Sequence, residues 1–282
     1  MKTRLMLRAE PQVIKEDRIQ LILSTGEGEI TYVTQKEMNS GTYYDAGREI
    51  LRQGLSVPTG EDIAPLVHSI YYPQRHKKYA FRKIKSELEL NDEGFWVYQI
   101  NLWTPKGVYV VHDNHVEGMS KKLEIYDLEE KLKNGKELSW GGIRFSTDGK
   151  VRFAPKQSYR LEGEEGEDCS ESPIIYEDHT PETFVKDGFI IASYNETGAE
   201  LLGEVLSKRK CLSAIEGFHV RDGQAPVQEL SSLYFLQSYE LCFSGNSGDG
   251  CEDYSDPSDE GYFNTTMGVL RRGNESESGV VQ

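Results

Sequence analysis

The sequence predicts an α+β protein in which an antiparallel sheet of hairpins is covered by four or five helices. Three observations support this class. Segments that alternate with a period of two are joined by turn sequences, segments of helical period lie among them, and no regular βαβ alternation is present. A chain of 282 residues is long enough for one large core. We therefore expect one compact body and not a doubly wound parallel sheet.

The first expected elements are a hairpin and a helix. Ile19 to Leu23 and Glu29 to Val33 flank the turn sequence Ser-Thr-Gly-Glu-Gly. A helix follows from Ser40, as its cap, to Gln53. Gly54 then occupies the position at which a left-handed residue ends many helices.

Two more helices are expected before the central strands. Thr59 and Asp62 have the spacing of a capping box, which predicts that a second helix starts there. Pro65 lies past its first turn and predicts a kink. A third helix is expected from Gln74 to Leu90.

The best-defined hairpin comes next. Phe95 to Trp103 alternates Trp96, Tyr98, Ile100 and Leu102 on one face, and Val108 to Val111 follows Thr-Pro-Lys-Gly, which has Pro and Gly where a type I turn favours them. Helical periodicity then returns at a set of residues that ends before Asn134-Gly135, namely Leu123, Tyr126, Leu128 and Leu132.

A further hairpin spans Ile143 to Phe153, and its hydrophobic pattern predicts a register. A three-residue loop with Gly149 left-handed pairs Phe145 with Val151 and separates apolar from charged residues. Arg144 would then face Arg152 on the exposed side, with Lys150 nearby. Because like charges opposite each other are unfavourable, we expect an anionic group to share that face.

The later elements are a strand, a helix and a second strand. Gly188 to Tyr194 is predicted to be a strand, and Thr197 and Glu200 a capping box for the helix that follows. Leu230 to Phe243 is also predicted to be a strand. Because Gly188 to Asn195 resembles Gly107 to Asn114, a duplicated βα unit is an alternative to the ordinary use of Gly and Asn around helices.

The negative charge is concentrated in two stretches. Residues 162–182 hold nine acids and residues 244–260 hold six, with no Lys or Arg in either. The rest of the chain balances at 32 acids and 32 bases although the net charge is −15. We therefore divide the chain into a first part of the body at 1–161, an acidic mobile insertion at 162–182, a second part of the body at 183–243, and an acidic loop with a polar tail at 244–282.

Basic residues form the first candidate site. On the expected third helix, Arg75, Lys78, Arg82 and Lys85 fall on one flank, with tyrosines close by in sequence. Together with Arg144, Lys150 and Arg152 they form a candidate anion-binding set. Such stripes suit phosphate backbones and base stacking, although solvated Lys and Arg are also common on ordinary helix surfaces.

The second candidate is His112-Asp113-Asn114-His115 at the end of a strand. His112, Asp113 and His115 could hold a divalent metal, which would make the protein a metal-dependent, hydrolase-like enzyme. No third strong ligand follows from the spacing, and Asp-Asn after a strand also marks an ordinary turn. Apart from this metal, no cofactor is predicted.

The chain shows no signal-peptide region and no apolar run long enough for a membrane span, so we expect a cytosolic protein that contacts no membrane. The four cysteines form no CxxC pair. The leading functional hypothesis is a non-catalytic binding protein for an anionic partner, with nucleic acid as one candidate, whose acidic segments screen its cationic faces. The metal-dependent enzyme and a structural subunit of an assembly, including a homo-oligomer, are the alternatives.

Overall fold

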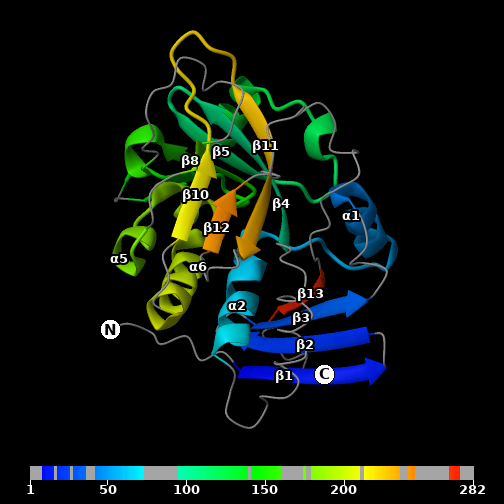
Figure 1. Ribbon diagram of the computed structural model, residues 1–282. Coiled ribbons are helices and arrows are strands. Elements are labelled where there is room, and N and C mark those ends of the chain that lie inside the picture. Colours follow the sequence, from blue (N-terminus) through cyan, green and yellow to red (C-terminus); the bar gives the residue numbers. More distant parts are fainter. Residues whose placement is uncertain are drawn as a thin grey trace, which may run out of the picture.

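The computed structural model describes residues 8–15, 18–25, 28–35, 42–72, 95–138, 141–160, 174–175, 179–209, 213–235, 241–244 and 267–273. It confirms the α+β class: two sheets and a set of helices form one body, without regular βαβ alternation (Figure 1). The expected helix from Gln74 to Leu90 lies outside the described residues, as do most of the first acidic stretch and nearly all of the second.

The smaller sheet has four antiparallel strands in the order β1-β2-β3-β13. Three of them follow one another, β1 (Arg8–Lys15), β2 (Arg18–Thr25) and β3 (Gly28–Gln35), and β13 (Gly268–Gly273) joins them from the far end of the chain. The predicted first hairpin is confirmed as β2 and β3, with Thr25 opposite Gly28.

The larger sheet has nine strands in the order β6-β7-β8-β5-β4-β11-β12-β10-β9. Its pairs are antiparallel except for β10 with β12. The strands are β4 (Phe95–Thr104), β5 (Gly107–His112), β6 (Lys136–Glu137), β7 (Arg144–Phe145), β8 (Val151–Pro155), β9 (Ile174–Ile175), β10 (Ser213–Gly217), β11 (Val227–Phe235) and β12 (Leu241–Ser244). The predicted hairpin of β4 and β5 is confirmed, with Thr104 opposite Gly107.

The helices are α1 (Tyr43–Arg52), α2 (Gly60–Tyr71), α4 (Ile125–Leu132), α5 (Pro181–Phe184) and α6 (Gly188–Arg209), with short 3-10 turns η2 (Gly118–Ser120) and η3 (Lys156–Ser158). Thr42, and not Ser40, caps α1, and Gly54 after it has a φ of 73° as expected. The Thr59 and Asp62 capping box of α2 is confirmed, since the Thr59 backbone N–H donates to the Asp62 carboxylate at 2.8 Å.

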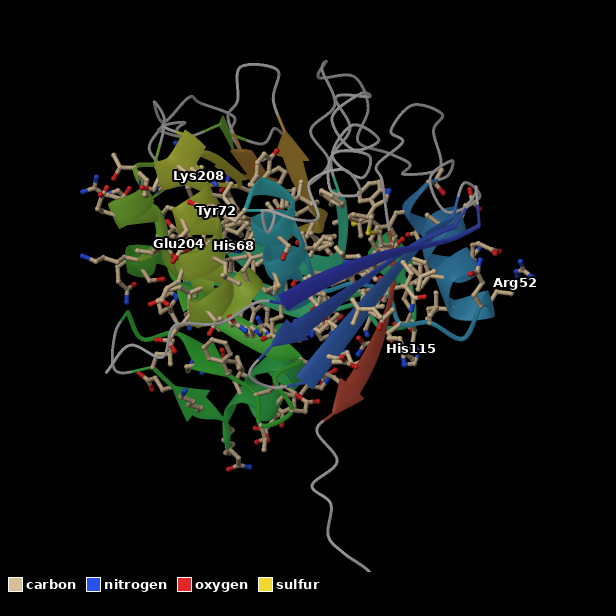
Figure 2. All side chains as sticks on the ribbon, turned by 90° about the horizontal axis from the view of Figure 1, so that it is seen from below. Arg52, His68, Tyr72, His115, Glu204 and Lys208 are labelled. Atoms are coloured by element: carbon tan, nitrogen blue, oxygen red, sulfur yellow. The ribbon has the colours of Figure 1, made fainter. Side chains whose placement is uncertain are left out.

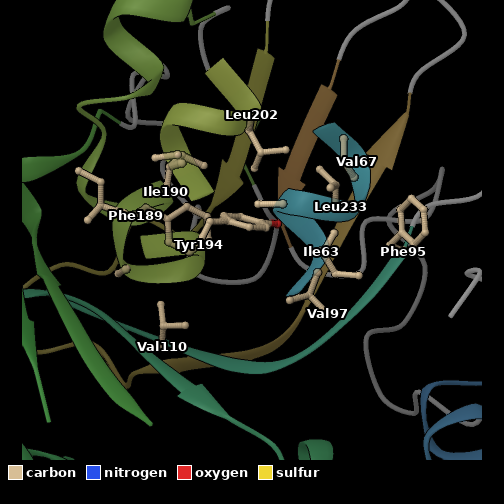
Figure 3. Packing of buried hydrophobic residues seen from close by; sticks show 14 of the residues in the cluster. Ile63, Val67, Phe95, Val97, Val110, Phe189, Ile190, Tyr194, Leu202 and Leu233 are labelled. Carbon is tan, nitrogen blue, oxygen red and sulfur yellow. The ribbon is translucent and has the colours of Figure 1, made fainter. Parts of the chain in front are cut away.

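Both faces of the large sheet are buried, because β4 is apolar on both sides. The predicted face of Trp96, Tyr98, Ile100 and Leu102 packs with side chains of α1 and α4. The opposite face, which includes Phe95 and Val97, packs with α2, α6 and the small sheet (Figure 3). Side chains of the helices and of the central strands thus form two cores on either side of β4, and polar side chains on the second face are enclosed by the helices.

The predicted register of the hairpin from Ile143 to Phe153 is wrong. Phe145 lies opposite Arg152, and Arg144 lies opposite Phe153. The prediction assumed that one face was open to water, whereas this sheet is covered on both. Each arginine instead lies over the ring opposite it, at 4.7 Å for Arg144 on Phe153 and 5.4 Å for Arg152 on Phe145. Gly149 is left-handed, as predicted.

The predicted strand from Gly188 to Tyr194 is also wrong, because these residues form the first half of α6. The buried Asp187 caps it by accepting hydrogen bonds from the backbone N–H groups of Phe189 and Ile190 at 2.9 and 3.1 Å. Asn195 then breaks α6 with φ 57° and ψ 176°. Its side chain, rather than the predicted Thr197, caps the second half through Gly198 N–H at 2.7 Å.

Two further expectations are revised by these elements. Residues 107–112 are a strand whereas residues 188–194 are helical, so the two segments are not copies of one βα unit. Pro181 and Glu182, at the end of the first acidic stretch, begin helix α5, and Ile174–Ile175 within the stretch form β9. The acidic stretch therefore includes parts of the ordered body.

Candidate functional site

The hairpin arginines of the candidate anion-binding set are both engaged within the protein. Arg144 donates to both oxygens of Glu129 in α4, at 2.8 and 2.7 Å. Arg152 is 2% exposed and forms an ion pair with Glu61 of α2. Lys150 is exposed. Because Arg144 and Arg152 point to opposite faces of the sheet, the shared cationic face expected from the sequence does not exist.

The structure does not bring His112, Asp113 and His115 together as one ligand set. Asp113 is buried, and its carboxylate accepts hydrogen bonds from Tyr43 Oη at 2.6 Å, Glu117 N–H at 2.9 Å and Gly118 N–H at 2.7 Å. His112 is partly buried, with a buried Nε2 atom, whereas His115 is exposed (Figure 2). Among the described residues no three metal-ligating side chains form a cluster.

The four basic residues of the expected third helix, Arg75, Lys78, Arg82 and Lys85, lie outside the described residues. The structure does show the surface from which this segment starts. Residue Tyr72, three positions before Arg75, lies at the end of α2 beside the end of α6 (Figure 2). Lys208 of α6 reaches that point, with its ammonium 3.7 Å from the centre of the Tyr72 ring. In the sequence, Lys208 begins a second basic run, Lys208-Arg209-Lys210, and its contact residue Tyr72 precedes the first basic run by three positions.

A buried polar group that the sequence analysis missed lies on the face of the large sheet under α2 and α6. Gln99 of β4 and His112 of β5 are directly opposite each other, and Arg152 of β8 lies on the same face. The available signal was that Gln99 and Asn101 place polar side chains on one face of a strand that is mostly apolar. Periodicity could not show which elements cover it.

The first turn of α2 and the residues before the break in α6 pack on this polar group. Gly60 N–H at the first turn of α2 donates to Gln99 Oε1 at 2.9 Å. A Cβ atom on Gly60 would lie 2.1 Å from the Ser193 carbonyl oxygen, so only glycine permits this approach. Three buried polar atoms here have no hydrogen-bond partner: Gln99 Nε2, His112 Nε2 and Ser193 Oγ. We call Gln99, His112 and Ser193 the interior site.

Two arginines lie next to the interior site, and each is paired with a carboxylate. Burial and then the positive charges of Arg152 and Arg271 lower the pKa of His112 to about 3, so its ring is neutral at physiological pH. Arg271 of β13 also forms an ion pair with Asp62, donating to its two carboxylate oxygens at 3.0 and 2.5 Å. The large sheet, α2 and the small sheet thus meet at this point.

A neighbouring group of polar side chains on the same face of β4, around Glu229, has its hydrogen bonds formed within the protein. Asn101 Nδ2 and Trp103 Nε1 donate to Glu229 Oε1 at 3.0 and 2.6 Å. Ser231 Oγ donates to Asn101 Oδ1 at 2.9 Å. None of these side-chain atoms is without a partner, in contrast to the interior site.

In comparisons with known proteins, no family model, no curated protein and no solved structure matches this chain. None of the described helices combines the length and the apolar character that a membrane crossing requires. The arguments about function that follow rest on the residues and the geometry given above.

Proposed function

We propose that the protein is a non-catalytic binding protein that engages an anionic partner through the basic segment from Arg75 to Lys85. Six of these 11 residues are Lys or Arg, with Tyr79 among them. The observation that supports the proposal is that Lys208, near the end of α6, contacts the ring of Tyr72, three positions before Arg75 in the sequence. Nucleic acid is the anionic partner that a dense set of lysines and arginines with aromatic neighbours suits best.

The contacts at the end of α2 hold Tyr71 and Tyr72 next to the last turns of α6. Lys208 Nζ donates to the Tyr71 carbonyl oxygen at 3.2 Å, and Tyr72 Oη donates to the Glu204 carbonyl oxygen at 2.6 Å. The rings of Tyr72 and His68 are stacked with centres 4.6 Å apart. Arg75 follows Tyr72 by three residues, which span at most about 11 Å of chain. The chain length therefore keeps Arg75 within about 11 Å of Tyr72, the residue that Lys208 contacts, which supports the proposal.

Of the three hairpin residues in the candidate anion-binding set, only Lys150 keeps a binding role in this proposal. Arg144 and Arg152 are held by Glu129 and Glu61, so their role is in the fold. Lys150 is exposed and stays within the proposal as a peripheral cation. The two acidic stretches would screen the basic segments at low salt, because the Debye length is about 30 Å at 0.01 M and falls to about 8 Å at physiological ionic strength.

Fluorescence titration of a labelled single-stranded oligonucleotide, with a duplex for comparison, tests this function. The test variant changes Arg75, Lys78, Arg82 and Lys85 to Gln. Its matched control removes the same charge from exposed lysines elsewhere, by changing Lys106, Lys122, Lys131 and Lys136 to Gln. If four phosphate contacts are lost, affinity should fall at least about tenfold at low salt, and the slope of log affinity against log salt should become shallower by about 3.

The control variant should keep nearly all of the affinity, because only general attraction between the protein and the oligonucleotide is reduced. Equal losses in the two variants would mean that net charge, and not this segment, governs binding. Absence of binding by the intact chain at low salt would overturn the proposal.

A further inference from the structure

The interior site has a fixed set of unused hydrogen-bond donors. Gly60 N–H donates to the amide oxygen of Gln99, which sets the orientation of that amide, since the reversed amide would place N–H against N–H. Both N–H groups of Gln99 Nε2 are therefore free, in a side chain that is fully buried. An unmade buried hydrogen bond is unfavourable, so the fold keeps these donors at a free-energy cost.

His112 and Ser193 add to the same set. His112 faces Gln99 across the β4–β5 pair, where opposite Cβ atoms lie about 5 Å apart, and its Nε2 atom is also unpartnered. The backbone of Ser193 lies against Gly60, and its hydroxyl group has no partner although the residue is 2% exposed. Amide, imidazole and hydroxyl groups can all donate. The nearby carboxylates in the described part of the chain are engaged, because Glu61 and Asp62 pair with arginines and Asp148 accepts from Ser146 Oγ and Lys150 N–H.

The surroundings favour a ligand with negative charge. The first turn of α2 presents the positive end of a helix dipole at Gly60, and the guanidinium groups of Arg152 and Arg271 lie close by. The backbone at Asn195, two residues after Ser193, has a conformation that is almost restricted to glycine, and such strain is concentrated at ligand sites. The neighbouring group around Glu229, on the same face of β4, has its side-chain donors hydrogen-bonded within the protein.

We propose that the interior site binds an oxyanion, the carboxylate or phosphate group of a small molecule, through Gln99 Nε2, Ser193 Oγ and His112 Nε2. The ligand oxygens accept from the three groups, and the neutral His112 donates as its Nε2–H tautomer. Glu61, which is 38% exposed, and Arg271, which is 51% exposed, place the site near the surface at the junction of the two sheets. This proposal does not depend on the basic segment.

Titration of the full chain with inorganic phosphate and, separately, acetate tests the proposal, with sodium chloride used to hold ionic strength constant. The side-chain amide signals of Gln99, followed by NMR, should shift with saturation, and the melting temperature should rise. Ser193→Ala removes a hydroxyl group that has no partner in the free protein, so it should fold normally and weaken binding at least about fivefold. Gln99→Met should abolish the binding.

Ser231→Ala is the control, since it removes a hydroxyl group from the closed neighbouring group and should leave the titration unchanged. The variant in which Arg75, Lys78, Arg82 and Lys85 are Gln should also bind phosphate normally, which separates this site from the proposed function. The proposal is overturned if neither anion moves the Gln99 signals, if Ser193→Ala binds as tightly as the parent chain, or if a crystal grown with phosphate shows only water among the three groups.

Discussion

Arg152 connects three parts of the fold through one side chain. Its guanidinium group donates to the Ala192 carbonyl oxygen of α6 at 3.0 Å and to the Gly149 carbonyl oxygen of the hairpin turn at 3.1 Å, and it pairs with Glu61 of α2. Arg152→Met keeps the apolar stem but leaves these acceptors without their donor. We expect the free energy of unfolding to fall by about 2–4 kcal/mol in urea denaturation.

Arg144→Met is the matched control for this prediction. Arg144 sits in the same hairpin and pairs with Glu129 through two hydrogen bonds, but both side chains are partly exposed. An exposed pair contributes up to about 1 kcal/mol, so the loss should be clearly smaller than for Arg152→Met. Similar losses in the two variants would mean that the buried contacts of Arg152 stabilise little.

His112 should make the protein sensitive to acid. Its pKa is about 3 in the folded protein and 6.5 in its unperturbed state, because burial and neighbouring cations disfavour the charged ring. Between these values the unfolded chain binds a proton that the folded chain does not, so stability falls as pH falls below 6.5. The slope from this group is at most about 1.4 kcal/mol per pH unit. Urea unfolding at pH 7.5 and pH 5 should show a smaller loss in His112→Asn, and an unchanged loss would refute this assignment.

Only some of these residues could be recognised from the sequence. Asp113, Arg144 and Arg152 were singled out, but their roles depend on partners such as Tyr43 and Glu61, which are 70 and 91 positions away in the chain. A pattern of local spacing contains no information about such pairs. The interior site was missed for the same reason, because Ser193 and Gly60 reach Gln99 only after two helices pack on the sheet.

The break in α6 provides a test at the level of the element. Asn195 has a φ of 57° and a ψ of 176°, which cost an ordinary residue about 1–3 kcal/mol. Glycine adopts this conformation without strain, loses only a few tenths of a kcal/mol of capping, and loses somewhat more entropy on folding. Asn195→Gly should therefore raise the free energy of unfolding by roughly 0.5–1 kcal/mol. Asn195→Ala, which keeps the strain and loses the cap, should lower it by about 1–2 kcal/mol.

The elements that were predicted correctly have their signals within a few residues. Pro105 and Gly107 define the turn between β4 and β5, and Thr59 with Asp62 defines the start of α2. The short apolar run from Gly188 to Tyr194 has no such signal, because strands and buried helices both contain runs of this kind. Asp187 caps that helix, but a single Asp before an apolar run also occurs at strand ends, so tertiary packing decided the outcome.

At the scale of the whole molecule, the core between the large sheet, α2 and α6 also joins the small sheet to the large one. Leu21, Leu23 and Tyr32 of the small sheet belong to the same buried cluster as side chains of α2 and α6. Tyr32 Oη also donates to the Asp62 carbonyl oxygen at 2.6 Å. Residues near the two ends of the described chain, in β1 to β3 and β13, are thus joined to the middle of the fold. The sequence pattern predicted one compact body, but it did not indicate that β13, near the C-terminal end of the described chain, pairs with β3 in the small sheet.

The separation of charge between the body and the acidic stretches can be tested by deletion. Because β9 and α5 belong to the ordered body, the deletion should remove only Gly163 to Ser172, which contain five acids. Loop length changes closure entropy by only about 0.6 kcal/mol per doubling, so the variant should fold with nearly unchanged stability.

A second variant keeps the length of the stretch and changes the five acids to Gln or Asn. If these charges screen the basic segment, both variants should bind a single-stranded oligonucleotide more tightly at low salt, and the gain should shrink as salt shortens the Debye length. Tighter binding by the deletion alone would assign the effect to the loop and not to its charge, and unchanged binding by both folded variants would show that these acids screen nothing.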